Sequence, residues 1–282
     1  MPVLQLDNEV MPQTKRSKLD PADLAGRWIN TNSHGRGIQE IVIDIEGDEV
    51  RLRAFSLGSE ALCAWGRTQA DRIYGSDVRA ERAMAFTARY DFGAFQTELQ
   101  GNMNLGLLVV ASFNRVGSLG YDYFAREFYR RGDPAASPVS TPWSIVTGQV
   151  GGDDPDEFDR APPALPFDGS ELVGEWWNTN SNSQGITRLR VGAGEKDGAI
   201  VSIWGPQVPD VSQHGSVKAA LFALSSGSRL AKAFSARFEA HDVALTLQAN
   251  IKQGVLVVAS FTEFKDSEGR SNYFHREFYY RN

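Results

Sequence analysis

The octapeptide GLLVVASF runs from Gly106 to Phe113, and it returns almost unchanged as GVLVVASF from Gly254 to Phe261, 148 positions later. Both segments have the composition of a β-strand. A strand with one face in water alternates apolar and polar side chains. These two segments are apolar on both faces, which indicates that both faces of each strand are covered.

The octapeptide belongs to a longer internal repeat. The segment LAGRWINTNSHGRGI from Leu24 matches LVGEWWNTNSNSQGI from Leu172 at the same offset of 148 residues. One loop is two residues longer in the second copy, after which YFAREFYRR from Tyr123 matches YFHREFYYR from Tyr273. Ordered matches of this length are not expected by chance, so the sequence predicts a duplicated domain.

The composition between the two copies predicts a linker. Seven of the twelve prolines lie between Pro134 and Pro166, and the segment from Asp133 to Ser170 holds seven acidic residues and one basic residue. Such a segment is expected to be extended, without a packed core of its own. The predicted parts are a disordered N-terminal tail, a first copy, an acidic proline-rich linker and a second copy, at residues 1–22, 23–132, 133–170 and 171–282.

Strand patterns dominate both copies. In the first copy, eight strands are expected to begin near Leu24, Gly37, Glu49, Leu62, Ala83, Ala94, Gly106 and Tyr121. Short hairpins between them favour an antiparallel up-and-down meander, and closure into a barrel removes its two unpaired edges. The sequence therefore predicts an all-β fold of two tandem eight-stranded antiparallel barrels.

The apolar octapeptides predict how these barrels pack. We predict that strand seven of one barrel packs on strand seven of the other across a pseudo-twofold axis, because a self-complementary interface uses the same segment from both copies. The alternative is that the linker covers these strands, through Trp143 or Phe158.

Each copy opens with a Gly-x-Trp motif, containing Trp28 or Trp176, and closes with an arginine in its last strand, Arg126 or Arg276. This pattern resembles the lipocalins (calycins), in which a late arginine covers a first-strand tryptophan at the closed end of the barrel. The resemblance implies a lipocalin-like fold and a structural role for these four residues. Two-domain lipocalin-like proteins include carotenoid hydratases and pericyclases, so it also implies a barrel pair that holds an apolar substrate without a cofactor.

The repeated Asn-Thr-Asn segment supplies the first candidate ligand-binding residues. If Trp28 points into the barrel, strand alternation directs Asn30 and Asn32 the same way, where amides can bind a carbonyl or hydroxyl group. The alternative is that they satisfy backbone groups near the first turn. The complete candidate set is Asn30, Asn32, Trp65, Arg89, Asn178, Asn180, Trp204 and Arg237.

Two arginines of this set lie between aromatic residues, Arg89 in FTARY and Arg237 in FSARF. An inward arginine would bind a carboxylate or an enolate oxygen. The favoured interpretation places both outside, with their stems along neighbouring strands.

Strand alternation also assigns faces to other polar residues. Four polar residues share one strand face and three apolar residues the opposite one, Gln100, Asn102, Gln248 and Asn250 against Leu99, Leu247 and Ala249. We expect the apolar set to line the lumens. Glu127 and Glu277 would be general acids if buried, but a partnership with a neighbouring arginine or lysine is the favoured interpretation.

Composition bears on the classes of partner. The net charge of −6 equals the acidic excess of the linker, and no basic cluster is present, which argues against nucleic-acid binding. No run of about 18 apolar residues and no secretory signal pattern is present, so no membrane partner is expected. The single cysteine, Cys63, fits a reducing compartment, the cytoplasm.

The chain carries no cofactor fingerprint, and its histidines lack metal-ligand spacing, so neither a cofactor nor a metal is expected. The leading prediction is capture of a small, mostly apolar molecule in a barrel lumen or at the seam between the barrels, in bacterial secondary metabolism. The alternative is a cofactor-free cyclase, isomerase or hydratase acting on an apolar biosynthetic intermediate. A third interpretation is a scaffold with solidly packed barrels, and the oligomeric state stays open.

Overall fold

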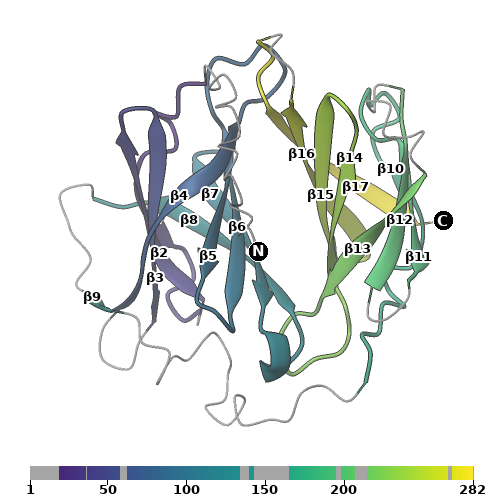
Figure 1. Cartoon of the computed structure of the whole chain (residues 1–282), viewed down its shortest axis with the longest axis horizontal. Helices are drawn as coiled ribbons and strands as arrows, with labels where there is room; N and C mark the ends of the chain where they lie inside the picture. The colour runs from purple at the N-terminus through teal and green to yellow at the C-terminus, as the bar shows by residue number, and fades with distance from the viewer. Residues whose placement is uncertain are drawn as a thin grey trace, which may run out of the picture.

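The computed structural model describes residues 19–35, 37–57, 62–133, 140–142, 165–194, 198–206, 215–265 and 269–281. It is an all-β structure in which two closed, eight-stranded antiparallel barrels lie side by side (Figure 1). The described residues contain one short 3-10 turn, η1 (Gly117–Leu119), and no other helix. The prediction of two tandem eight-stranded barrels is confirmed.

The first barrel follows the chain order. Its strands are β1 (Gly26–Asn30), β2 (Ile38–Glu46), β3 (Glu49–Leu57), β4 (Leu62–Tyr74), β5 (Ala85–Asp91), β6 (Gln96–Asn104), β7 (Leu107–Arg115) and β8 (Tyr123–Arg131). β1 pairs with both β2 and β8, and this pairing closes the barrel. A ninth strand, β9 (Ser140–Pro142), pairs in parallel with β4, so this part of the expected linker joins the sheet.

The second barrel repeats the arrangement. Its strands are β10 (Gly174–Asn178), β11 (Arg188–Ala193), β12 (Gly198–Trp204), β13 (Ser216–Phe222), β14 (Ala233–Glu239), β15 (Val243–Lys252), β16 (Val255–Phe264) and β17 (Tyr273–Arg281). Here β10 closes the barrel by pairing with β11 and β17. The two octapeptides form β7 and β16, as the sequence predicts.

Apolar side chains fill the lumen of each barrel, because every second residue of a strand points inward. The packed residues include Trp28, Ile41, Leu52, Phe86, Leu99 and Val110 in the first barrel and Trp176, Leu189, Val201, Phe234, Leu247 and Ala249 in the second. The predicted inward direction of Leu99, Leu247 and Ala249 is confirmed.

A buried tryptophan lies toward one end of each barrel, which we call its base, but the arginine that covers the tryptophan is not the expected one. Trp28 is fully buried, and the Arg131 guanidinium lies 4.5 Å from its ring centre. Arg281 covers Trp176 in the same way, at 4.7 Å. The assignment of this role to Arg126 and Arg276 is wrong, because a residue five positions earlier on a strand points to the opposite face.

Part of the predicted N-terminal tail belongs to the first barrel. Leu19 is buried in its core, and the backbone of Asp20 exchanges hydrogen bonds with Glu81 and Ala83. At the far end of the expected linker, the ring of Phe167 packs on Tyr121. Trp143 and Phe158, the alternative cover for the apolar strands, lie outside the described residues.

The outward faces of β7 and β16 are covered by the other barrel. The ring of Phe113 on β7 lies 5.0 Å from that of Phe222 on β13, and the ring of Phe261 on β16 lies 5.0 Å from that of Tyr74 on β4. These two contacts are related by the repeat, as the predicted pseudo-twofold symmetry requires. In both ring contacts the residue on strand seven packs on the last residue of β4 or β13, and not on strand seven of the other barrel.

Candidate functional site

One cavity lined by described residues lies outside the lumens, at the centre of the seam. It has a volume of about 10 Å³ and is lined from both barrels, by Arg126 and Arg276, by the amides of Gln100, Asn102 and Gln248, and by phenylalanine rings. We call it the seam cavity. The outward polar face predicted for β6 and β15 is therefore buried between the barrels instead of facing water.

The two seam arginines are charged groups in a sheltered place. Arg126 pairs across the sheet with Ala111 on the apolar face of β7, and Arg276 does the same with Ala259 on β16. Burial lowers the pKa of Arg126 to about 9, with the positive charge of Arg276 adding to the effect. Burial also lowers the pKa of Arg276. Neither arginine forms an ion pair within the described residues.

The second cavity is an open groove of about 290 Å³ at the base of the first barrel. Its lining includes Asp23, Ser76, Arg82, Met84, Met103 and Arg131, and we call it the base groove. Met103 packs on the barrel core, while Met84 packs on the aromatic cluster of the seam. The groove therefore lies between the base of one barrel and the interface with the other.

Polar groups border the apolar floor of the base groove. Arg82 forms an ion pair with Asp23 at 3.1 Å, and Arg131 donates to the backbone oxygens of Asp23 and Ala25. Two guanidinium groups and one carboxylate leave the lining with one net positive charge.

The second copy differs at the corresponding place. The residues equivalent to Met84 and Asp23 are Lys232 and Glu171, which form an ion pair with each other. Leu230 stands where the first copy has Arg82. The duplication has therefore kept the two barrels but not the chemistry of the base groove.

The two asparagines of each predicted site lie in different environments, one buried and one exposed. Asn30 is buried and donates to the backbone oxygen of Ile38 at 2.8 Å, and its own oxygen accepts from the Asn32 backbone. Asn178 makes the same two contacts, to Ile186 and Asn180. The second asparagine of each motif, Asn32 or Asn180, is exposed beyond the strand end and not inward as expected. These contacts match the backbone-satisfying alternative.

The two candidate tryptophans lie apart. Trp65 packs edge-on against Tyr90 and Phe92 beside the first barrel's core and donates to Ser56 Oγ at 3.0 Å. Trp204 is exposed on the outside of the second barrel, with the Arg188 guanidinium 3.9 Å from its ring centre. Neither tryptophan lines the two cavities.

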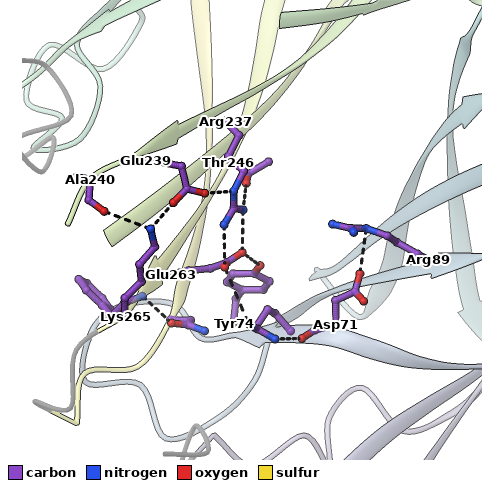
Figure 2. A network of polar contacts seen from close by, with 12 residues as sticks. Asp71, Tyr74, Arg89, Arg237, Glu239, Ala240, Thr246, Glu263 and Lys265 are labelled. Carbon is purple, nitrogen blue, oxygen red and sulfur yellow. Dashed lines mark hydrogen bonds and ion pairs between the residues drawn. The ribbon is translucent and has the colours of Figure 1, made fainter. Parts of the chain in front are cut away.

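Arg89 and Arg237 lie on the outside of their barrels, as the favoured interpretation predicts. Arg89 faces Asp71 at 3.4 Å, and Arg237 faces Glu263 and Glu239 (Figure 2). Glu263 also accepts a hydrogen bond from Tyr74 of the first barrel at 2.9 Å. Burial, together with the nearby Glu263 charge, raises the pKa of Tyr74. This network joins the barrels and is complete without a ligand.

Glu127 and Glu277 share a strand face with the buried Tyr129 and Tyr279, and within the part of the chain that the structure describes neither forms an ion pair with an arginine or lysine. Glu127 accepts from the Tyr129 hydroxyl at 3.0 Å, and Glu277 accepts from Ser183 at 2.5 Å and from Tyr279 at 3.2 Å. Burial raises the pKa of Glu127. Neither carboxylate lines the base groove or the seam cavity, so their position favours a structural role.

The raised pKa of Glu127 predicts a pH dependence of stability. The folded state binds this proton more tightly than the unfolded state, so folding loses stability as pH rises from about 4 toward 7. Glu127→Gln removes the titratable group. The free energy of unfolding of the variant minus that of the native protein should therefore increase as the pH rises over this interval. Urea unfolding at a series of pH values measures the difference. A difference that stays constant, or that falls with pH, contradicts the assignment.

The groove residues were missed by the sequence analysis because they come from five separate places in the chain and form no motif. Within the described residues, no cluster of three or more His, Cys, Asp or Glu side chains is placed to hold a metal ion. In that same part of the chain, no helix has the length and apolar character to cross a membrane. No protein-family model matches the chain, and no curated protein matches it.

Proposed function

We propose that this protein binds a small molecule that has an apolar body and one anionic group, and that the base groove is its site. The groove volume of about 290 Å³ is close to the lower end of small-ligand pockets. Met84 and Met103 offer flexible apolar surface, which adapts to an irregular ligand. The net positive charge of the lining, from Arg82 and Arg131 against Asp23, favours an anionic head group.

The observation that carries this proposal is the difference between the copies. In the second barrel Lys232 pairs with Glu171, whereas in the first barrel Met84 stands at the lysine position and Asp23 pairs with Arg82 instead. If the residues around the two tryptophans had only a structural role, both copies would be expected to keep the same contacts, because Arg131 covers Trp28 as Arg281 covers Trp176. The first copy has a groove at this place.

The resemblance to two-domain lipocalin-like proteins supports an apolar ligand. Packed side chains occupy the lumens, so the proposal places this ligand beside the seam rather than inside a barrel. The single cysteine of the sequence supports the cytoplasm as the compartment. Catalysis is not part of the proposal, because the partly buried carboxylates of Glu127 and Glu277 do not line the groove.

Decanoate and decanol are suitable probes, since they share a chain and differ in charge. Arg82→Leu should weaken decanoate binding by about tenfold, the equivalent of one lost charged contact, and leave decanol unchanged. Arg79→Leu removes a nearby exposed arginine outside the groove and should change neither affinity. Isothermal titration calorimetry measures both.

A second pair of variants tests the apolar floor. Met84→Glu places a carboxylate against both the chain and the head group and should abolish decanoate binding, whereas Met84→Leu should keep it within about twofold. The proposal is contradicted if the native protein binds neither probe, or if Met84→Glu binds decanoate as tightly as the native protein does.

A further inference from the structure

The seam cavity brings two guanidinium groups together without a carboxylate between them. Arg276 Nη2 donates to Asn102 Oδ1 at 2.6 Å, but the Nε atoms of Arg276 and Arg126 are buried and have no hydrogen-bond partner. The contact equivalent to the first one, from Arg126 to Asn250, is not made, and Asn250 Oδ1 is also without a partner. The centre of the interface therefore has unused donors and two positive charges.

The acidic residue beside the cavity does not neutralise these charges directly. Glu98 accepts hydrogen bonds from the amides of Gln248, at 3.0 Å, and Gln100, at 3.3 Å. Among the described residues, it forms no ion pair with either arginine. The equivalent position in the second copy is Thr246, so the second barrel adds no carboxylate there.

Buried charges are costly unless they are paired. Arg126 and Arg276 have their guanidinium groups against the rings of Phe124 and Phe274, at 5.5 and 5.7 Å, and such contacts do not remove the net charge. A negative ion between them would accept the free Nε donors and offset the repulsion between the two cations.

The size of the cavity limits the ion. A volume of about 10 Å³ leaves room for no more than one monatomic ion, and the rings of Phe113 and Phe261 line the space. We infer that the seam cavity binds a single halide-sized anion, chloride in the cell, held by Arg126 of the first barrel and Arg276 of the second. The site is independent of the base groove, and its ion acts as a counterion that joins the barrels.

Water is the competing occupant, because Gln248 Oε1 on the cavity wall lacks a donor and a water could supply one. Crystals of the full chain grown in sodium bromide separate the two. The anomalous signal of bromine should give a peak between the two guanidinium groups. A cavity without that peak, or one that holds water at full bromide concentration, overturns the inference.

Thermal unfolding supplies the test in solution. The melting temperature should be about 3 °C higher in 0.2 M (roughly physiological) sodium chloride than in sodium gluconate of the same concentration, since gluconate is too large for the cavity. Arg276→Gln should abolish this difference, and Arg130→Gln, which changes an exposed arginine of β8, should keep it. An equal melting temperature in both salts for the native protein contradicts the site. If Arg276→Gln does not fold, the bromide peak in the native protein decides.

Discussion

Replacing Phe261 with alanine is expected to lower the free energy of unfolding by about 3–5 kcal/mol, as for other fully buried phenylalanines. Its ring lies at the seam, 5.0 Å from both Tyr74 of the other barrel and Phe274 of its own. The change removes apolar surface from an interface that each barrel needs to cover its strand seven, and leaves a void that rigid β-sheets cannot close. Urea unfolding followed by circular dichroism measures the loss.

Phe278 is the matched control for this prediction. It lies on the neighbouring strand β17, and its side chain is exposed on the outside of the barrel. Phe278→Ala should therefore change the free energy of unfolding by no more than about 0.5 kcal/mol. If both variants lose the same amount, Phe261 is not buried between barrels, and the covered seam is wrong.

The second large effect is expected at the base of the second barrel. Trp176→Ala should cost about 3–5 kcal/mol of unfolding free energy. The Trp176 ring is buried, its Nε1 donates to the Leu172 backbone at 2.9 Å, and Arg281 lies over its face. The variant loses the packing of the indole ring in the core, the hydrogen bond to the Leu172 backbone and the contact with Arg281.

The adjacent residue provides an internal comparison for the tryptophan plug. Trp177 is the next residue of β10, and it points outward, with 37% of its surface exposed. Trp177→Ala should cost about 1 kcal/mol or less, mainly through its contact with Arg188. Equal losses for the two variants in urea unfolding would mean that β10 does not present Trp176 to the core.

The repeat made most of the fold predictable. Two matched copies double each strand signal, and the alternation of apolar and polar residues from Val243 to Ile251 correctly assigns Leu247 and Ala249 to the lumen. The apolar octapeptides also correctly indicate that β7 and β16 need cover on their outer faces. Both inferences depend on the alternation of apolar and polar residues along single strands, which is visible in the sequence without knowledge of the tertiary structure.

Contacts that depend on exact register were harder to predict. The arginine above each tryptophan is set by the pairing of Trp28 with Arg131, which a motif alone does not give. The burial of Arg126 depends on how the second barrel docks, and nothing in YFAREFYRR indicates that docking. The roles of Asn30 and Asn178 were also hard to predict. Both resembled ligand-binding residues, but each donates a hydrogen bond to a backbone oxygen of its own barrel, that of Ile38 or Ile186.

The base groove was out of reach of the sequence for a different reason. A hollow is a property of side chains brought together from distant segments, and Asp23, Ser76 and Arg131 share no spacing that marks them. The sequence does contain one signal of the base groove, a difference between the two copies. The two copies differ in charge at Met84 and Lys232, each directly before an otherwise similar strand, β5 or β14, and such a divergence inside a structural repeat is a place to look for a site.

A crystal structure of the full chain with decanoate tests the central claim most directly. The account predicts density for the carboxylate beside Arg82 and Arg131 and for the chain over Met84 and Met103, with both lumens still filled by their own side chains. Density for the chain inside either lumen contradicts the account. So does an empty base groove in crystals grown at a decanoate concentration that saturates the protein in solution.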